Sequence, residues 1–196
     1  MELIKIDYEK PGLEDINKIV NVLEKGGVVL APSDTCYGFL CDIQNEEAVE
    51  KIYKIKNRSL KIPVSIAVDF SIIDEYICVS EEQQEMITDY LPGLYTLVLQ
   101  KSDLVPSFIT NNTDFVGVRV MKCHFMNLLL SNFKHALVTT SANKSGTGPK
   151  YDIKDILGEV DNSLIDLVID GGKLKATSPS KVIKFNEDGE QEIIRW

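Results

Sequence analysis

The chain has 196 residues, of which 44% are hydrophobic, and its 21 basic and 30 acidic residues give a formal net charge of −9. This composition excludes a disordered chain and suits one globular domain spanning residues 1–196, with two small domains as the alternative. The negative charge disfavours broad contact with nucleic acid or an anionic membrane, so an anion site has to concentrate its basic side chains in one cleft.

In chain order, the apolar periodicity predicts a strand (2–6), a helix (13–25), two strands (27–31, 37–41), a helix (46–57), a strand (64–68), a helix (81–90), three strands (96–100, 116–120, 136–140), a short helix (152–158) and three closing strands (166–170, 182–185, 191–195). Asn45, Ser80 and Asp152 are the caps expected for the second, third and fourth helices. The alternation predicts an α/β domain with helices packed on a central sheet. Some antiparallel pairing is expected, because the strand 116–120 closely follows another strand.

The cysteines, the histidines and the N-terminal residues indicate which metal sites and which cellular compartment to expect. None of the four cysteines forms a CxxC pair, and the two histidines lack zinc-ligand spacing. Cys36 and Cys41 lie in an apolar stretch, so both are expected to be small core residues. No apolar run approaches the ~20 residues of a membrane span, and the first residues do not read as a signal peptide. We therefore expect a cytoplasmic protein with no membrane contact and with reduced thiols.

Polar clusters interrupt the apolar pattern beside buried strands, which is where open α/β sheets bind ligands. Residues 32–38, PSDTCYG, offer hydroxyls and a carboxylate in a turn, although a plain hairpin turn is the alternative. Lys56 and Arg58 stand at the end of a helix, where they either clamp phosphate or complement the helix dipole. Arg119 is flanked by valines in a strand, which is costly unless it is paired, faces a site, or snorkels from a sheet edge.

A further cluster, TTSANKSGTGP at 139–149, combines hydroxyls, an amide and glycines after an apolar strand. Such a loop can approach a phosphate or ribose closely, although it is neither a Walker loop nor a dinucleotide fingerprint. Ser141 and Asn143 stand two residues apart, so both can point to the same side of an extended turn. The structural alternative is that Asn143 closes an Asx-turn and Ser141 caps nearby backbone.

Together and in this order, these clusters resemble the motifs of the YrdC/Sua5 family. Residues 32–39 read PSDTCYGF where the family has PTDTVYGL, and residues 139–146 contain its TSANxSG. Further matches are AVEKIYKIKNR (48–58), Pro63-Val64, PGLYT (92–96), VGVRV (116–120), Gly171-Gly172, Ser180-Lys181-Val182 and Ile194-Arg195. The resemblance covers residues 13–196 and corresponds to the short form of the family, without the extra C-terminal Sua5 domain.

The resemblance implies a YrdC-like twisted mixed sheet with flanking helices and a concave, positively charged site. It implies a nucleotidyltransferase that joins L-threonine, bicarbonate and ATP into threonylcarbamoyl-AMP and pyrophosphate, with Mg²⁺ accompanying the ATP. A downstream transferase complex would then modify tRNA at position 37. No residue is expected to act as a covalent or acid–base catalyst. By motif position, ATP would be bound by Lys56, Arg58, Ser141, Asn143 and Arg195, and threonine by Thr35, Arg119 and Ser180.

Ser33 replaces a threonine of the family pattern and keeps its hydroxyl, and three further positions depart from the pattern: Ile62, Met121 and Lys181. They leave open whether activity is reduced or redirected. One alternative is a YciO-like paralogue that binds nucleotide or RNA without synthase activity. A second is an RNA-binding module contacting tRNA or double-stranded RNA, which the charge of −9 weakens. A third is a carbamoyltransferase domain like that of HypF, a far longer protein whose zinc-finger and acylphosphatase regions have no counterpart here.

Overall fold

The computed structural model describes residues 1–186 and 190–195. This part of the chain contains ten strands: β1 (Glu2–Lys5), β2 (Val29–Pro32), β3 (Tyr37–Asp42), β4 (Ser65–Ala67), β5 (Tyr95–Gln100), β6 (Phe115–Arg119), β7 (Leu137–Ser141), β8 (Leu167–Asp170), β9 (Lys181–Phe185) and β10 (Gln191–Arg195). Its α-helices are α1 (Leu13–Glu24), α2 (Glu46–Ile55), α3 (Glu81–Thr88), α4 (Ser107–Thr110), α5 (His124–Phe133) and α6 (Ile153–Leu157), and two 3-10 helices are η1 (Phe70–Glu75) and η2 (Asn162–Leu164).

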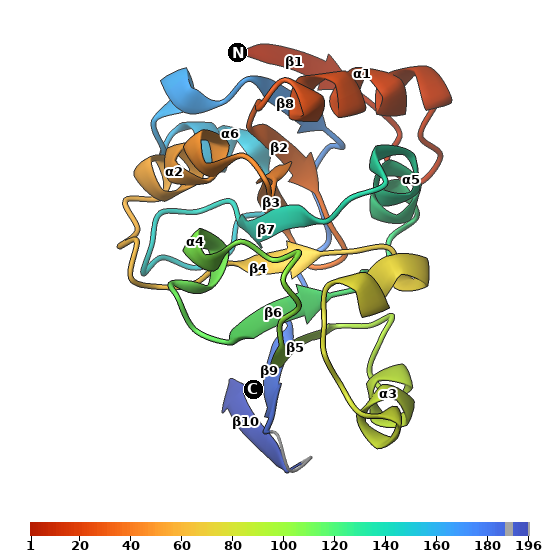
Figure 1. Cartoon of the computed structure of the whole chain (residues 1–196). Coiled ribbons are helices and arrows are strands. Elements are labelled where there is room, and N and C mark those ends of the chain that lie inside the picture. Colours follow the sequence, from red (N-terminus) through yellow and green to blue (C-terminus); the bar gives the residue numbers. More distant parts are fainter. Residues whose placement is uncertain (187–189, 196) are drawn as a thin grey trace.

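The strands form one sheet in the order β1-β8-β2-β3-β7-β4-β6-β5-β9-β10. Figure 1 shows its two edges, β1 and β10, at opposite ends of the molecule. The sheet is mixed, with parallel pairs such as β4–β6 and antiparallel pairs such as β5–β6 and β3–β7. The prediction of a single-domain mixed α/β sheet is therefore confirmed, as is the antiparallel pairing expected around residues 116–120.

Both faces of the central strands are buried, which is why they read as continuous apolar runs. Along the segment that includes β2, Val28 and Leu30 belong to one core cluster, whereas Val29 and Ala31 belong to another. Helices α2, α3 and α6 contribute to the first cluster, and α1 and α5 pack together over the second. The sheet thus carries a separate apolar layer on each side.

Helix α5 is missing from the sequence-based prediction. Its apolar residues recur at spacings of three and four: Phe125, Met126, Leu129, Leu130 and Phe133, all buried. Neither end carries a usual signal, because the N-cap is Cys123 without a side-chain hydrogen bond, and the C-terminal left-handed residue is Lys134 rather than glycine. The predicted caps Asn45, Ser80 and Asp152, in contrast, all accept their expected backbone N–H bonds.

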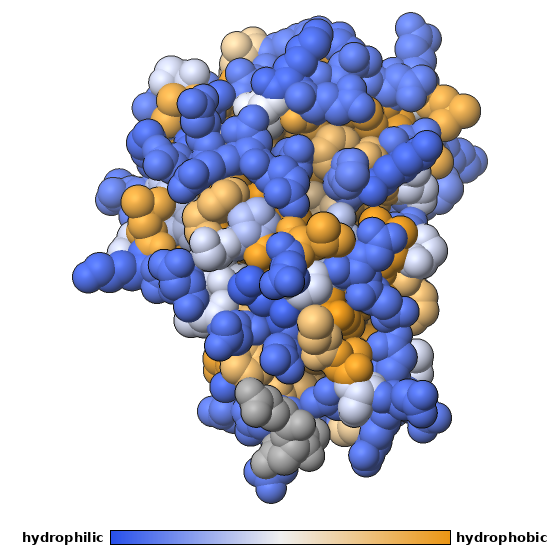
Figure 2. All heavy atoms as spheres, in the orientation of Figure 1, coloured by the Kyte–Doolittle hydropathy of each residue, from blue (hydrophilic) through white to orange (hydrophobic). Residues whose placement is uncertain are grey.

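The surface in the orientation of Figure 2 is mostly hydrophilic, with smaller apolar areas between the polar ones. Within residues 1–186 and 190–195, no helix combines the length and apolar character needed to cross a bilayer.

Candidate functional site

A cavity of about 320 Å³ brings together segments that are far apart in the sequence. Its walls come from the β2–β3 turn, the chain after α2, strands β5, β6 and β7, the loop after β7, and the start and end of the β9–β10 hairpin. Seven of the eight predicted site residues line it: Thr35, Arg58, Arg119, Ser141, Asn143, Ser180 and Arg195. Among the described residues that line it, three are arginines and none is a carboxylate. An anion is the ligand that such a lining attracts.

The end of α2 separates Lys56 from Arg58. Asn57 adopts a left-handed conformation with φ of 47°. Its N–H bonds the Lys54 carbonyl at 3.0 Å, and the Arg58 N–H bonds the Tyr53 carbonyl at 2.9 Å. This is the Schellman pattern, which reverses the chain at a helix terminus. After it, Arg58 lines the cavity, where Nη2 donates to the Pro63 carbonyl at 2.7 Å, whereas Lys56 is buried.

Lys56 is the predicted site residue that the cavity wall does not include. Its side chain is 2% exposed, and its Nζ donates to the backbone carbonyls of Ser141 and Asn143, the latter at 2.9 Å. Burial, and secondarily the charge of Arg58, lowers its pKa to about 8. Lys56 therefore holds the start of the loop after β7 by its backbone, from behind the cavity surface.

Asn143 both lines the cavity and closes this loop. Its Nδ2 donates to the carbonyls of Lys144 at 2.9 Å and of Thr147 at 2.7 Å, so the side chain holds the loop, but not as the Asx-turn of the structural alternative, in which the side-chain oxygen would accept a backbone N–H. Its Oδ1 is buried and has no hydrogen-bond partner within the described chain. Ser141, at the end of β7, is exposed. The two residues thus differ: Asn143 holds the loop with its side chain, whereas Ser141 contributes to the loop's framework through its backbone carbonyl, which accepts from Lys56.

Glu159 supports the same loop from outside the cavity. Its carboxylate accepts from the Thr147 hydroxyl at 2.7 Å and the Lys144 N–H at 3.2 Å, and it forms an ion pair with Lys150 at 2.9 Å. These contacts, the Thr147 hydrogen bond first, lower the pKa of Glu159. Sequence reasoning missed this residue, because nothing in the pattern around position 159 connects it with a loop twelve positions earlier.

Arg119 is held in the middle of the sheet. Strand β6 lies between β4 and β5, so the alternative of an edge strand with a snorkelling arginine is wrong. The side chain is nearly buried, and Nη2 donates to Asp34 Oδ1 at 2.8 Å. Its Nε is buried without a hydrogen-bond partner in the described chain. A buried donor left unpaired costs about 1–3 kcal/mol unless a ligand supplies an acceptor.

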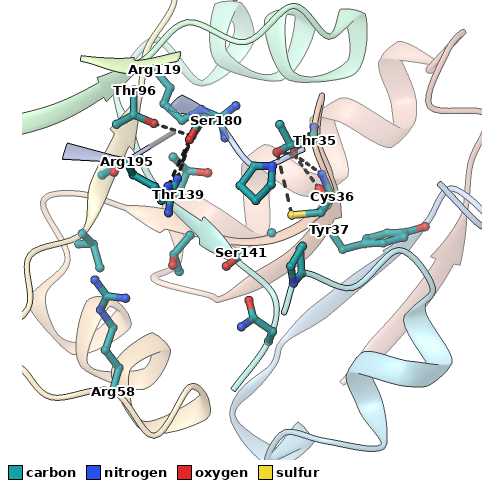
Figure 3. A pocket seen from close by; sticks show the side chains of 18 of the residues that line it. Thr35, Cys36, Tyr37, Arg58, Thr96, Arg119, Thr139, Ser141, Ser180 and Arg195 are labelled. Carbon is teal, nitrogen blue, oxygen red and sulfur yellow. Dashed lines mark hydrogen bonds between the residues drawn. The ribbon is translucent and has the colours of Figure 1, made fainter. Parts of the chain in front are cut away.

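Ser180, Thr96 and Arg195 form a hydrogen-bonded group beside Arg119 (Figure 3). The hydroxyl oxygens of Thr96 and Ser180 are 2.8 Å apart, and Arg195 Nη2 donates to the Ser180 carbonyl at 2.8 Å. Burial, followed by the nearby charge of Arg119, lowers the pKa of Arg195. Gly117 leaves room for this group, because a Cβ there would stand 3.2 Å from the Thr96 methyl carbon. Thr96 was not predicted as a site residue, although it ends the PGLYT motif.

The β2–β3 turn is a hairpin turn and a cavity wall at once. Pro32 pairs with Tyr37 in the ladder, and the Ser33 hydroxyl donates to the Cys36 carbonyl at 2.7 Å. Thr35 and Cys36 line the cavity (Figure 3). The prediction of a core residue is confirmed for Cys41. It is incomplete for Cys36, which is buried but faces the cavity, and whose thiol pKa is raised, chiefly by burial.

Of the departures from the family pattern, Ser33 lines the cavity, whereas Ile62, Met121 and Lys181 do not. Ile62 has a half-exposed side chain, and its carbonyl accepts from the Tyr53 hydroxyl at 2.8 Å. Met121 is fully buried in the core beneath α1 and α5. Lys181 starts β9, opposite Tyr95 of β5. These three residues are therefore outside the first layer of side chains around the cavity.

Comparison with known proteins decides the family. The Sua5/YciO/YrdC family model, described as telomere recombination, matches residues 21–196. The chain belongs to this family. A Methanocaldococcus jannaschii protein with the provisional name threonylcarbamoyl-AMP synthase is 34% identical over 180 residues, covering 89% of this chain and 84% of that protein.

Solved structures of the Sua5/YciO/YrdC family share the fold. P. abyssi Sua5, solved in complex with L-threonine, superposes with a TM-score of 0.85 at 27% identity, covering 94% of this chain. The match spans 54% of the length of that Sua5 chain. E. coli YciO superposes with a TM-score of 0.90 at 26% identity, covering 100% of this chain and 95% of YciO.

Proposed function

We propose that this member of the Sua5/YciO/YrdC family is an L-threonylcarbamoyladenylate synthase, an enzyme of the nucleotidyltransferase class. One observation carries the proposal: three arginines and a set of hydroxyls from distant segments converge on one cavity. The synthase name of a 34% identical relative and the L-threonine complex of P. abyssi Sua5 support the choice of substrate.

The proposed reaction has two steps. The threonine amine attacks bicarbonate, forming a C–N bond and releasing water to leave a carbamate. A carbamate oxygen then attacks the α-phosphorus of ATP, forming threonylcarbamoyl-AMP and expelling pyrophosphate. Each step crowds anionic groups together, so positioning and positive charge are the main contributions that the protein can make. A separate transferase complex would pass the threonylcarbamoyl group to tRNA in the cytoplasm.

In this proposal each end of the cavity binds one substrate. Arg58 and the exposed Ser141 face the triphosphate, and Asn143 shapes the loop around it. Arg119 donates a hydrogen bond from its unpaired Nε to the threonine carboxylate. Thr35 and Ser180 lie on the side of the cavity that faces the hydroxyl group of the amino acid. Arg195 is bonded to Ser180, so it stands where the two substrates meet.

Mg²⁺ would enter as part of the nucleotide substrate. Within the described chain, no cluster of three or more His, Cys, Asp or Glu could hold a metal ion, and no carboxylate lines the cavity. The oxygens that Mg²⁺ prefers would therefore come from phosphate and water. Bound there, the ion would reduce the charge of the triphosphate, while the arginines bind its remaining oxygens.

The test is pyrophosphate release from ATP by the full chain, with L-threonine and bicarbonate added separately and together. The proposal predicts rapid release only when all three substrates are present. Release that ignores threonine, or no release above background, would contradict it. Arg58→Ala in the same assay identifies whether the observed turnover belongs to this cavity.

A YciO-like paralogue is the second candidate, because E. coli YciO matches this chain over its whole length. Such a protein would bind nucleotide, or RNA such as tRNA, without synthase activity. RNA binding by surface charge falls steeply with salt and does not need ATP. A filter-binding series at increasing salt therefore separates this candidate from the synthase.

A further inference from the structure

The three arginines of the cavity are held in different ways. Arg58 donates to the backbone carbonyls of Ile62 and Pro63, and Arg195 donates to the Ser180 carbonyl. Arg119 instead donates to a carboxylate, that of Asp34. Of the ion pairs found within the described residues, this is the most deeply buried, with side chains 10% and 3% exposed.

Asp34 is fixed on both of its oxygens. Oδ1 accepts from Arg119 Nη2 at 2.8 Å, and Oδ2 lies 3.4 Å from the backbone nitrogen of Lys122, which donates to it. Asp34 does not line the cavity itself, although its neighbours Ser33 and Thr35 do. It can therefore affect a ligand in this cavity through the guanidinium group that it holds.

The negative charge of Asp34 also offsets the repulsion between the side chains of Arg119 and Arg195. Arg119 and Arg195 are close enough for the charge of Arg119 to contribute to lowering the Arg195 pKa, after the larger effect of burial. Two cations that approach each other in a partly buried site need a fixed counter-charge before the ligand arrives. The Asp34 carboxylate supplies it through its hydrogen bond to Arg119 Nη2, from a residue that is not part of the cavity lining.

We propose that Asp34 is a positioning residue for amino-acid recognition. It holds one edge of the Arg119 guanidinium group, so that the buried and unpaired Nε is presented to the substrate carboxylate. The identity of that substrate as L-threonine rests on the proposed function. The geometry of Arg119 does not, and it can be tested separately.

The kinetic test compares Asp34→Asn with a matched control. Asparagine keeps the size of the side chain but removes its charge and turns an acceptor toward Lys122 into a donor. The Michaelis constant for L-threonine should rise about 10-fold or more, and that for ATP should change less than about 2-fold. In the control Asp69→Asn, a carboxylate that accepts from Ser71 and Ser131 is lost outside the cavity wall, so neither constant should move. Equal increases for both substrates in Asp34→Asn would overturn the proposal.

A double-variant cycle tests whether Asp34 acts through Arg119. Arg119→Gln alone should raise the Michaelis constant for L-threonine strongly. Asp34→Asn should add no further increase in the Arg119→Gln background, because its target is already gone. Effects that multiply in the double variant would overturn the positioning role.

The ¹⁵N resonance of the Arg119 Nε–H gives a readout that does not depend on catalysis. In the wild type it should be resolved and slow to exchange with water, and it should shift when L-threonine is added. In Asp34→Asn it should broaden or vanish, while the backbone spectrum stays folded. An unchanged Nε resonance in Asp34→Asn would overturn the proposal. A wild type that positions Arg119 but neither turns over nor binds L-threonine would instead overturn the proposed function.

Discussion

The two ends of the cavity are built differently. The end proposed for the nucleotide consists of Arg58, Ser141 and the loop after β7, whose shape depends on hydrogen bonds that Lys56 and Asn143 donate and that Glu159 accepts. A Cβ placed on Gly146 or Gly148 would meet no atom within 4 Å, so the loop tip stands in solvent. The end proposed for the amino acid consists of Thr96, Arg119 and Ser180, and Arg195 bonds Ser180 at the border between the two ends. The side chains of these four residues bond one another or a buried carboxylate.

This difference matches the demands of the two proposed ligands. A triphosphate is large and highly charged, and a loop of backbone amides and a few side chains can adapt to it. A small amino acid has to be distinguished from similar ones by a few groups, which needs side chains held rigidly. Substitutions at the nucleotide end should therefore act mainly on ATP, and those at the amino-acid end mainly on threonine.

The largest effect is expected for Arg58→Ala. Losing a charged donor to the triphosphate should reduce turnover about 100- to 1,000-fold, with the increase in Michaelis constant falling on ATP. The fold should survive, because Arg58 is half-exposed and lies beyond the end of α2. Lys54→Ala, on the exposed side of the same helix, is the control and should be near neutral. Near-normal turnover of Arg58→Ala would remove Arg58 from the site.

Separate variants of Ser141 and Asn143 should split binding from loop structure. Ser141→Ala should weaken Mg-ATP binding about 10-fold and leave the ligand-free melting temperature nearly unchanged. Asn143→Ala should also lower the melting temperature by several degrees, since losing about 1–2 kcal/mol costs about 2–4 °C per kcal/mol in a chain of this size. Melting curves with and without Mg-ATP measure both. A lower ligand-free melting temperature for Ser141→Ala would show that its hydroxyl belongs to the framework.

Substrate analogues probe the rigidity of the amino-acid end. L-serine should be a poorer substrate than L-threonine by about 10-fold, because one methyl group carries limited discrimination. L-valine should be worse than serine, because it has no hydroxyl to bond with the Thr96–Ser180 pair, whose two hydroxyls already bond each other. Pyrophosphate release at saturating ATP compares the three. Equal turnover of valine and threonine would contradict the assignment of this end.

The remaining effect concerns stability alone and is a pH dependence that comes from Lys56. Its pKa is about 8 in the folded chain, against 10.5 for an ordinary lysine. Between these values the unfolded chain binds the proton and the folded chain does not, so the free energy of unfolding rises with pH on this account. Urea unfolding at about pH 8 and about pH 10 should show the wild type gaining stability relative to Lys56→Met. The same difference at both pH values would show that Lys56 stays charged.

Sequence reasoning reached most of the fold and of the cavity lining because its signals are local. A cap such as Asn45, or the run TSANKSG, is visible within a few residues. Helix α5 was not predicted because neither terminus carries a conventional capping residue. Arg119 was recognised because a charged residue in an apolar strand is costly to bury. In the structure this cost is reduced by an ion pair with Asp34.

What sequence reasoning could not supply are contacts between distant segments. Asp34 and Arg119 are 85 positions apart, and Thr96 and Ser180 are 84 apart. Lys56 was predicted to reach the nucleotide, because its spacing to Arg58 suggests two prongs of one clamp. The left-handed turn at Asn57 instead places the two side chains in different surroundings. The two-residue spacing between Lys56 and Arg58 does not reveal the backbone conformation of the residue between them.

The central claim is that one cavity incorporates the carbon of bicarbonate into an adenylate product and releases pyrophosphate from ATP. The most direct measurement counts labelled carbon from bicarbonate recovered in an adenylate product, together with the pyrophosphate released in the same reaction with L-threonine. The account predicts equal amounts of the two, and neither without threonine. Pyrophosphate released without labelled carbon in an adenylate would contradict it.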